Sequence, residues 1–394
     1  MNRMERPGES TSSRRAFLNS TASTGVLALV SGAASLGRAG GEDGPQTVVA
    51  AGADLKPRDG VAAVLDLLQR FPLVALAERH LLQEWHDFAS ALLLHPELPA
   101  QLTDIVVEFG NARHQETADR YLVELRPVAL ADFQAIWRFT IGGNVLWDAP
   151  VYGQFFRTVR AVNLRRPPDR RIRVLLGDPP FDHQRVRAAS DLAYVQSMAQ
   201  QRDAHYADVV IREVLKKSRR ALLVAGSAHL LRGLKAQRGA DRPNAASLVA
   251  AEAGDKLFVI EPLILPPDPP GDRLTRRVLA NISNWPAQSL ALLKGTWLGA
   301  TSESVRPWIN SSAHLAAKPE GARYGAQADA VLYPGPGQGQ TASQADPSLY
   351  LGGDYAEELR RLSKVASTSG RSTDFVADGL RRARAGPSWF EQWR

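Results

Sequence analysis

A series of short apolar runs, separated by longer segments of helical periodicity, constrains this chain more than any other feature. Strands that alternate with helices predict an α/β fold with a largely parallel central sheet flanked by helices. The runs are apolar at nearly every position, so we expect helices to cover both faces of the sheet. The runs are Leu73–Leu76, Ile105–Phe109, Ile172–Leu176, Ala221–Ala225, Leu257–Ile260 and, more weakly, Ala328–Tyr333.

The segments between the runs carry the spacing of amphipathic helices. The helices expected are Val61–Phe71, Leu81–Leu94, His114–Leu125, Leu130–Phe139, Tyr152–Asn163, Arg185–Lys217 and Tyr355–Leu362. The alternation is clearest over residues 55–264, which we expect to form the core. Residues 265–394 open with a Pro/Asp/Gly-rich stretch and are expected to form an extension packed on that core.

The first 39 residues are typical of an export signal. Ser12–Leu18 contains two adjacent arginines followed by Ala-Phe-Leu, and an apolar stretch follows at Gly25–Val30. Small residues then surround two candidate cleavage positions, after Ala34 or Ala39. This order resembles a twin-arginine signal, which predicts an exported, periplasmic or extracytoplasmic protein and the twin-arginine translocation machinery as a partner. The mature chain is expected to have no transmembrane span.

Charge and composition exclude several classes of function. The net charge is +7, but residues 1–39 hold five arginines against two glutamates, so the mature chain is only +4. Its basic residues are scattered without an aromatic-studded stripe, and we expect no nucleic-acid partner. The chain has no cysteine, so disulfides, thiolate metal sites and cysteine nucleophiles are excluded. Neither a G-x-S-x-G nor an H-E-x-x-H motif occurs.

Histidines and acids follow the predicted strands where each strand ends. Glu78 and His80 follow the first run, Glu108 lies near the end of the second, Asp178 follows the third and His229 the fourth. The carboxyl ends of parallel strands lie at one edge of the sheet, where open α/β sheets bind ligands. Taken singly, each residue is equally consistent with a cap or an ion pair, but together they predict a site at this edge.

This set of residues supports two kinds of chemistry. His80, His229, Glu78 and Glu108 could ligate a divalent ion such as Mn, Co, Zn or Fe and activate water on it. Without a metal, a histidine or glutamate could serve as general base while another carboxylate orients it. His86, on the following predicted helix, is a further candidate for holding a cofactor together with His80 and His229.

The order of three motifs resembles the Tiki/ChaN/erythromycin-esterase superfamily over roughly Phe71–Ile264. The motifs are Ala77–His80, Val107–Gly110 and Gly226–His229, with a related helix at Arg202–Ala207. One departure is Ala77, where the superfamily pattern has glycine. The resemblance implies an α/β fold with Glu78, His80, Glu108 and His229 as the site residues.

The resemblance is consistent with more than one function, because members of this superfamily differ in what they do. Its erythromycin-esterase-like members hydrolyse a lactone with His and Glu, its Tiki-like members are metal-dependent proteases, and its ChaN-like members bind haem. Our first hypothesis is an exported hydrolase that cleaves an ester, lactone or amide in a small molecule or peptide. The alternative is a non-enzymatic haem- or iron-binding protein of the cell envelope, with haem as its ligand.

Overall fold

A computed structural model describes residues 51–302 and 322–393, apart from residues 99, 142–143, 237–241, 268, 270, 272 and 371. The predicted export signal, residues 1–39, lies outside this range. Within it, no helix combines the length and the apolar character needed to cross a membrane.

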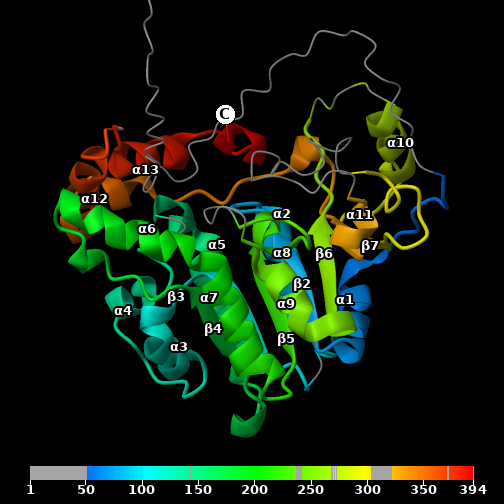
Figure 1. The fold of residues 1–394 in the computed structure, drawn as a ribbon, viewed down its shortest axis with the longest axis horizontal. Coiled ribbons are helices and arrows are strands. Elements are labelled where there is room, and N and C mark those ends of the chain that lie inside the picture. The colour runs from blue at the N-terminus through cyan, green and yellow to red at the C-terminus, as the bar shows by residue number, and fades with distance from the viewer. Residues whose placement is uncertain are drawn as a thin grey trace, which may run out of the picture.

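One eight-stranded sheet forms the centre of the molecule (Figure 1). Its spatial order is β1-β7-β8-β6-β2-β5-β3-β4; the six strands from β8 to β4 are parallel, and β7 is antiparallel to both its neighbours. The strands are β1 (Arg58–Asp59), β2 (Leu73–Glu78), β3 (Asp104–Asn111), β4 (Arg173–Asp178), β5 (Ala221–Gly226), β6 (Leu257–Pro262), β7 (Ser289–Leu292) and β8 (Ala330–Tyr333).

Helices flank this sheet, and the predicted α/β class with a largely parallel sheet is confirmed. The helices are α1 (Gly60–Arg70), α2 (Gln83–Leu94), α3 (Gln115–Leu122), α4 (Leu130–Ala135), α5 (Pro150–Asn163), α6 (Leu192–Gln200), α7 (Arg202–Val209), α8 (Ser227–Leu230), α9 (Ala245–Ala253), α10 (Arg273–Ile282), α11 (Tyr324–Gln327), α12 (Gly353–Ser367) and α13 (Phe375–Arg384).

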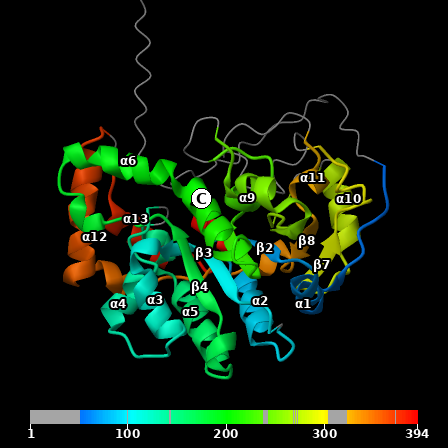
Figure 2. The same ribbon diagram turned by 60° about the horizontal axis from the view of Figure 1, so that its bottom comes forward.

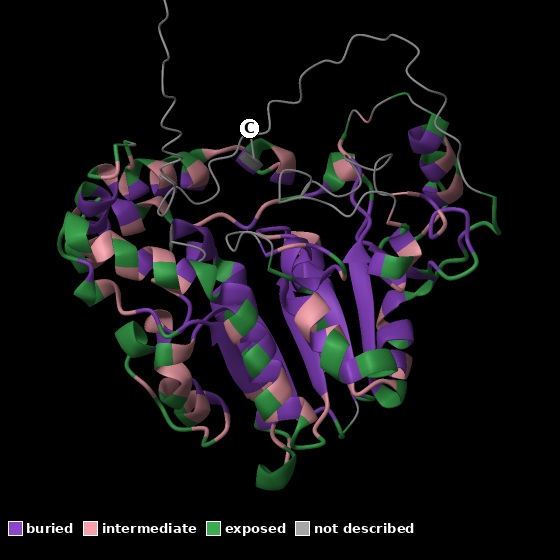
Figure 3. Ribbon diagram, viewed as in Figure 1, coloured by how far each residue is buried: buried purple, intermediate pink, exposed green. Residues whose placement is uncertain are grey.

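The sheet separates two apolar cores. Alternate side chains of a strand point to opposite faces, and in β2 Val74 and Leu76 join the core beneath α1, α2 and α5. Leu73 and Ala75 join the core beneath α7 and α9 on the other face. The central strands are buried along their whole length (Figure 3). Because helices cover both faces of the sheet, polar residues need not alternate with apolar ones along a strand. These strands therefore appear in the sequence as continuous apolar runs.

The chain after residue 265 contributes to the same sheet and also builds a third apolar cluster. β7 and β8 extend the sheet beyond β6. α12 and α13 pack with α6 around Val195, Leu359 and Phe375, and Figure 2 shows these helices together at one end of the molecule. This end lies next to the loop that precedes α5, because Ile141 and Val145 belong to the same cluster.

The single helix expected over Arg185–Lys217 is wrong. The segment forms α6, a break at Gln201, α7 and a π-helical stretch, Val210–Leu215. The physical reason is that its two halves have different partners. Val195 of α6 packs on the C-terminal cluster, whereas Tyr206 of α7 packs on the sheet.

Candidate active site

The strand ends bring the predicted acids and histidines to one edge of the sheet. Glu78, the last residue of β2, is in register with Gly226, the last residue of β5. His229 follows in the short helix α8, and Glu108 lies in β3 where its register with β4 is interrupted. Irregular pairing of this kind often re-aims a side chain beside a functional site.

Glu78 organises one half of the cluster. Its Oε1 accepts a hydrogen bond from the Tyr152 hydroxyl at 2.9 Å and lies 3.2 Å from Nε2 of His86. Its Oε2 lies 3.4 Å from Nδ1 of His80. The Glu78 and His86 side chains are buried, whereas the His80 side chain is 21% exposed. His80 is therefore the histidine of this half that solvent or a ligand can reach.

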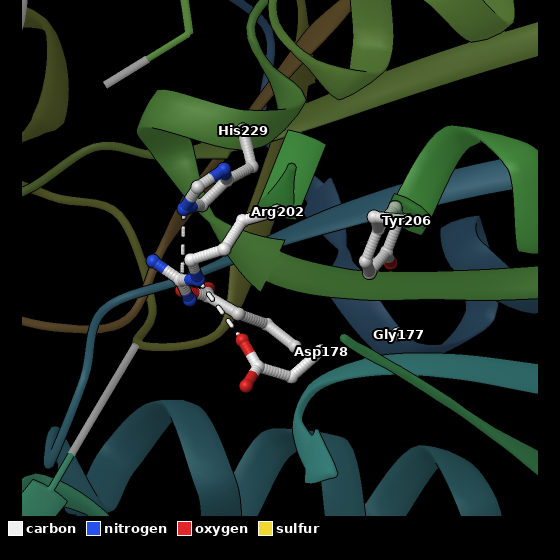
Figure 4. A pocket seen from close by; sticks show the side chains of 6 residues that line it. Gly177, Asp178, Arg202, Tyr206 and His229 are labelled. Atoms are coloured by element: carbon white, nitrogen blue, oxygen red, sulfur yellow. Dashed lines mark hydrogen bonds and ion pairs between the residues drawn. The ribbon is translucent and has the colours of Figure 1, made fainter. Parts of the chain in front are cut away.

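Glu108 and Arg202 organise the other half, in which Arg202 lies between Asp178 and His229 (Figure 4). Arg202 donates from Nη2 to Oε1 of Glu108 at 2.6 Å and from Nε to Oδ1 of Asp178 at 2.9 Å. The Gly226 backbone N–H donates to Oε2 of Glu108, also at 2.6 Å. One buried guanidinium thus neutralises two buried carboxylates. A small pocket lies beside them, and its lining comprises Glu108, Gly177, Asp178, Arg202, Tyr206 and His229.

His229 lies between two carboxylates. Its Nδ1 is 2.8 Å from Oδ1 of Asp203, and its Nε2 is 3.2 Å from Oε1 of Glu108. Burial alone would lower the pKa of His229, but the charges of Asp203 and Glu108 outweigh it and raise the pKa to about 10. His229 is therefore a fixed cation at neutral pH.

The His80–Glu78 pair titrates differently. Burial would raise the pKa of Glu78, but the nearby histidines lower it to about 2, so Glu78 is ionised throughout the physiological range. Burial would lower the pKa of His80, yet the Glu78 carboxylate outweighs it and raises the pKa above 6.5. His80 can therefore exchange a proton beside a carboxylate that stays charged.

The raised pKa of His229 predicts a pH-dependent stability. A group whose pKa is higher in the folded state stabilises fully below its unfolded pKa, here 6.5. That contribution is lost as pH rises toward about 10. We expect the free energy of unfolding, measured with denaturant, to fall over this interval more steeply than that of His229→Asn. Parallel pH curves for the two proteins would contradict the assignment.

Close backbone approach explains the glycine that ends β5. A Cβ on Gly226 would lie 3.0 Å from Nε2 of His80 and 3.3 Å from Oε2 of Glu108. A Cβ at these distances would press on the His80 ring and the Glu108 carboxylate, so glycine lets both lie close to this strand end. Ala77, the departure from the superfamily pattern, is accommodated because its side chain packs fully buried in the core beneath α7 and α9.

The arrangement of donors does not fit a divalent metal. Among the described residues, no three His, Asp or Glu side chains are placed to hold an ion together. Both oxygens of Glu108 already accept hydrogen bonds, and the Arg202 guanidinium beside them would repel a cation. Nδ1 of His229 is paired with Asp203. A metal cofactor therefore stays a prediction of the sequence.

The structure brings all five predicted site residues into one cluster: Glu78, His80, His86, Glu108 and His229. Sequence reasoning missed the roles of Tyr152, Arg202 and Asp203. Arg202 and Asp203 lie in the segment Arg202–Ala207, which resembles a helix of the superfamily. This resemblance was the signal that could have identified them as site residues. Tyr152 gave none, because a tyrosine in an amphipathic helix is indistinguishable from a core residue.

No family model matches this sequence, and no curated protein matches it either. Among solved structures, a crystal structure of a Bacillus cereus protein aligns with a TM-score of 0.51 and 11% identity, over 74% of this chain and 97% of that one. An erythromycin esterase variant in its open conformation aligns with a TM-score of 0.44 and 12% identity, over 69% and 92%. ChaN of Campylobacter jejuni, described with cofacial haem, aligns with a TM-score of 0.33 and 16% identity, over 52% and 90%.

At these identities the similarities concern the fold, and the Bacillus cereus structure carries that conclusion. ChaN and an erythromycin esterase, the kinds of protein that the three short motifs resemble, are among the solved structures that align with this chain. The chain has an α/β fold, with its candidate site at the carboxyl edge of the sheet.

Proposed function

We propose that this chain is a hydrolase in which His80 is the general base that activates water without a metal. The observation that carries the proposal is the position of the His80 ring between two carboxylates. Nδ1 lies 3.4 Å from Glu78, and Nε2 lies 4.0 Å from Oε2 of Glu108. The second separation is too long for a hydrogen bond, and one water molecule can bridge two polar atoms at this distance.

The hydrolytic step follows from this geometry. Glu78 orients the His80 ring through Nδ1, so Nε2 is the nitrogen that takes a proton from water. The water oxygen forms a bond to the carbonyl carbon of an ester, lactone or amide, and the carbonyl oxygen becomes an alkoxide. When the alkoxide collapses, the bond to the leaving group breaks and the protonated His80 returns its proton to that group. Arg202 and the protonated His229 hold Glu108 in place throughout.

The assay is hydrolysis of p-nitrophenyl butyrate, a macrocyclic lactone and a peptide by the purified chain, before and after treatment with a chelator. The proposal expects turnover of an ester or lactone that chelation leaves unchanged. Turnover that disappears on chelation and returns with Mn, Co, Zn or Fe would replace it by the metal-dependent mechanism. Absence of turnover, together with a Soret band on adding haemin, would favour the haem-binding alternative.

The pH profile tests the role of Glu78 in this mechanism. His80 acts as a base only when neutral, so kcat/KM is expected to fall as pH drops through its pKa, which lies above 6.5. Glu78→Gln removes the carboxylate that raises this pKa and should move the acidic limb to lower pH. An acidic limb at the same pH in both proteins would exclude His80 as the titrating base.

Export through the twin-arginine machinery also stays a proposal. It is supported by the paired arginines within Ser12–Leu18 and the apolar stretch Gly25–Val30. Fractionation of cells that produce the full chain tests it, with Arg14→Lys/Arg15→Lys as the matched control.

A further inference from the structure

Two segments of the C-terminal extension are joined to the turn that carries His80. The backbone carbonyl of His80 accepts a hydrogen bond at 2.7 Å from Nε1 of Trp389, more than 300 positions later in the chain. The next carbonyl, of Leu81, accepts one at 2.8 Å from the backbone N–H of Ser343. The carbonyl groups of His80 and Leu81 are therefore both hydrogen-bonded by residues of the C-terminal extension.

Residues 340–343 lie between this turn and the segment that contains Ser388 and Trp389. On one side, the Gln83 N–H donates to the Thr341 carbonyl at 3.0 Å, and the Thr341 hydroxyl donates to Glu84 at 2.7 Å. On the other side, the Trp389 N–H donates to the Gln340 carbonyl at 3.1 Å. Isolated antiparallel bridges join Leu82 to Ala342 and Thr341 to Ser388. The three segments form a small ladder, which we name the C-terminal clamp.

The clamp acts on a turn with an unfavourable backbone conformation. Leu81 has a φ of 68°, in the left-handed region that favours glycine, and its side chain is buried. Such a conformation persists only when surrounding contacts over-determine it. The contacts here are the Ser343 N–H on the Leu81 carbonyl and the Tyr152 hydroxyl, which accepts from the Leu81 N–H at 3.3 Å.

A second contact of the extension reaches the other side of the His80 ring. The hydroxyls of Tyr350 and Tyr355 donate to Asp148 at 2.8 Å, and Arg138 lies 3.3 Å from the same carboxylate. The preceding residue, Trp147, presents its ring to His80 edge-on, with ring centroids 4.8 Å apart. The extension therefore holds both the backbone that carries His80 and the loop that contacts its ring.

We propose that the C-terminal clamp, through Trp389, positions the His80 ring for proton transfer. Trp389 is a positioning residue: its indole N–H contacts the His80 backbone rather than the reacting atoms. This proposal rests on the proposed function for its kinetic consequence alone, because the orientation of His80 can be measured without substrate. The C-terminal extension therefore helps to hold the active-site histidine in position.

Trp389→Phe is the test, because it removes the N–H donor and keeps an aromatic ring. The matched control is Trp285→Phe, at a partly buried tryptophan that packs against Tyr333 in the other part of the extension. Side-chain spectra of ¹⁵N-histidine-labelled full chain report the imidazole nitrogens, and His80→Asn assigns the His80 signals. With p-nitrophenyl butyrate, we expect kcat to fall about tenfold at unchanged KM, the size of effect a small misplacement produces.

Changed His80 ring signals in Trp389→Phe, and unchanged ones in Trp285→Phe, would support the proposal. Unchanged His80 signals in folded Trp389→Phe would overturn it. If the wild-type chain hydrolyses nothing, the proposed function fails while the spectra still decide the positioning. If Trp389→Phe does not fold, hydrogen exchange of the Trp389 indole N–H in the wild-type chain replaces it, because this N–H is the donor to the His80 carbonyl. Slow exchange would support the proposal, and exchange as fast as that of a solvent-exposed indole would overturn it.

Discussion

Replacing His80 with asparagine is expected to lower kcat for ester or lactone hydrolysis by about 10²–10⁴-fold, the usual contribution of a general base. Asparagine keeps a polar side chain of similar reach but cannot accept the proton from water at neutral pH. The His80 side chain is 21% exposed and lies in the turn that follows β2, so its loss leaves the buried sheet unchanged. Steady-state kinetics with p-nitrophenyl butyrate, alongside circular dichroism, measure the effect.

The control for this experiment is His95→Asn. His95 directly follows the last residue of α2 and accepts a hydrogen bond from the Glu97 N–H, and it takes no part in the cluster. We expect the kinetic constants of His95→Asn to equal those of the wild type. Comparable activity in His80→Asn and His95→Asn would remove His80 from the mechanism and with it the proposed function.

Replacing Arg202 with methionine is expected to lower the free energy of unfolding by about 3–5 kcal/mol, the cost of breaking a buried ion pair from one side. The Arg202, Glu108 and Asp178 side chains are 7%, 6% and 0% exposed. Methionine fills much of the same space but leaves two carboxylates buried without their shared cation. Urea denaturation at pH 7 gives the free energy, and the unfolding midpoint should move to lower urea.

Arg212→Met supplies the comparison. Arg212 forms an ion pair with Asp208 at 3.0 Å, but the two side chains are 56% and 53% exposed. An exposed pair one helical turn apart contributes only about 0.3–0.5 kcal/mol. Equal losses in the two variants would mean that Arg202 is screened by solvent and does not neutralise Glu108 and Asp178 in the way described.

Six of the eight strands in the described part of the chain were predictable because each of the six carries its own local signal. The run at Leu73–Leu76 became β2, and that at Ala221–Ala225 became β5. β1 and β7 carried no such signal, since β1 has two residues and β7 has four. The break at Gln201 also escaped prediction, because the spacing of apolar residues does not say which of two surfaces a helix packs against.

The candidate site was predictable to the extent that it follows strand ends. Glu78, Glu108 and His229 come from strands or residues directly after them, and parallel pairing alone places such residues at one edge. Tyr152 and Trp389 come from a helix and from the C-terminal end of the described chain, and no local pattern connects either of them to His80. Their roles depend on contacts between residues far apart in the sequence.

The sequence by itself determined the class of fold and the edge of the sheet where the site lies. Apolar runs and helical periods are local properties of the chain, and the end of an apolar run gives the position of the strand end. Only the tertiary structure decided the charge state and support of that site. Arg202 neutralises Glu108 and Asp178, His229 is held protonated by Asp203, and the C-terminal clamp holds the His80 turn. Charge interactions and hydrogen bonds depend on distance and burial, and these exist only once the chain has folded.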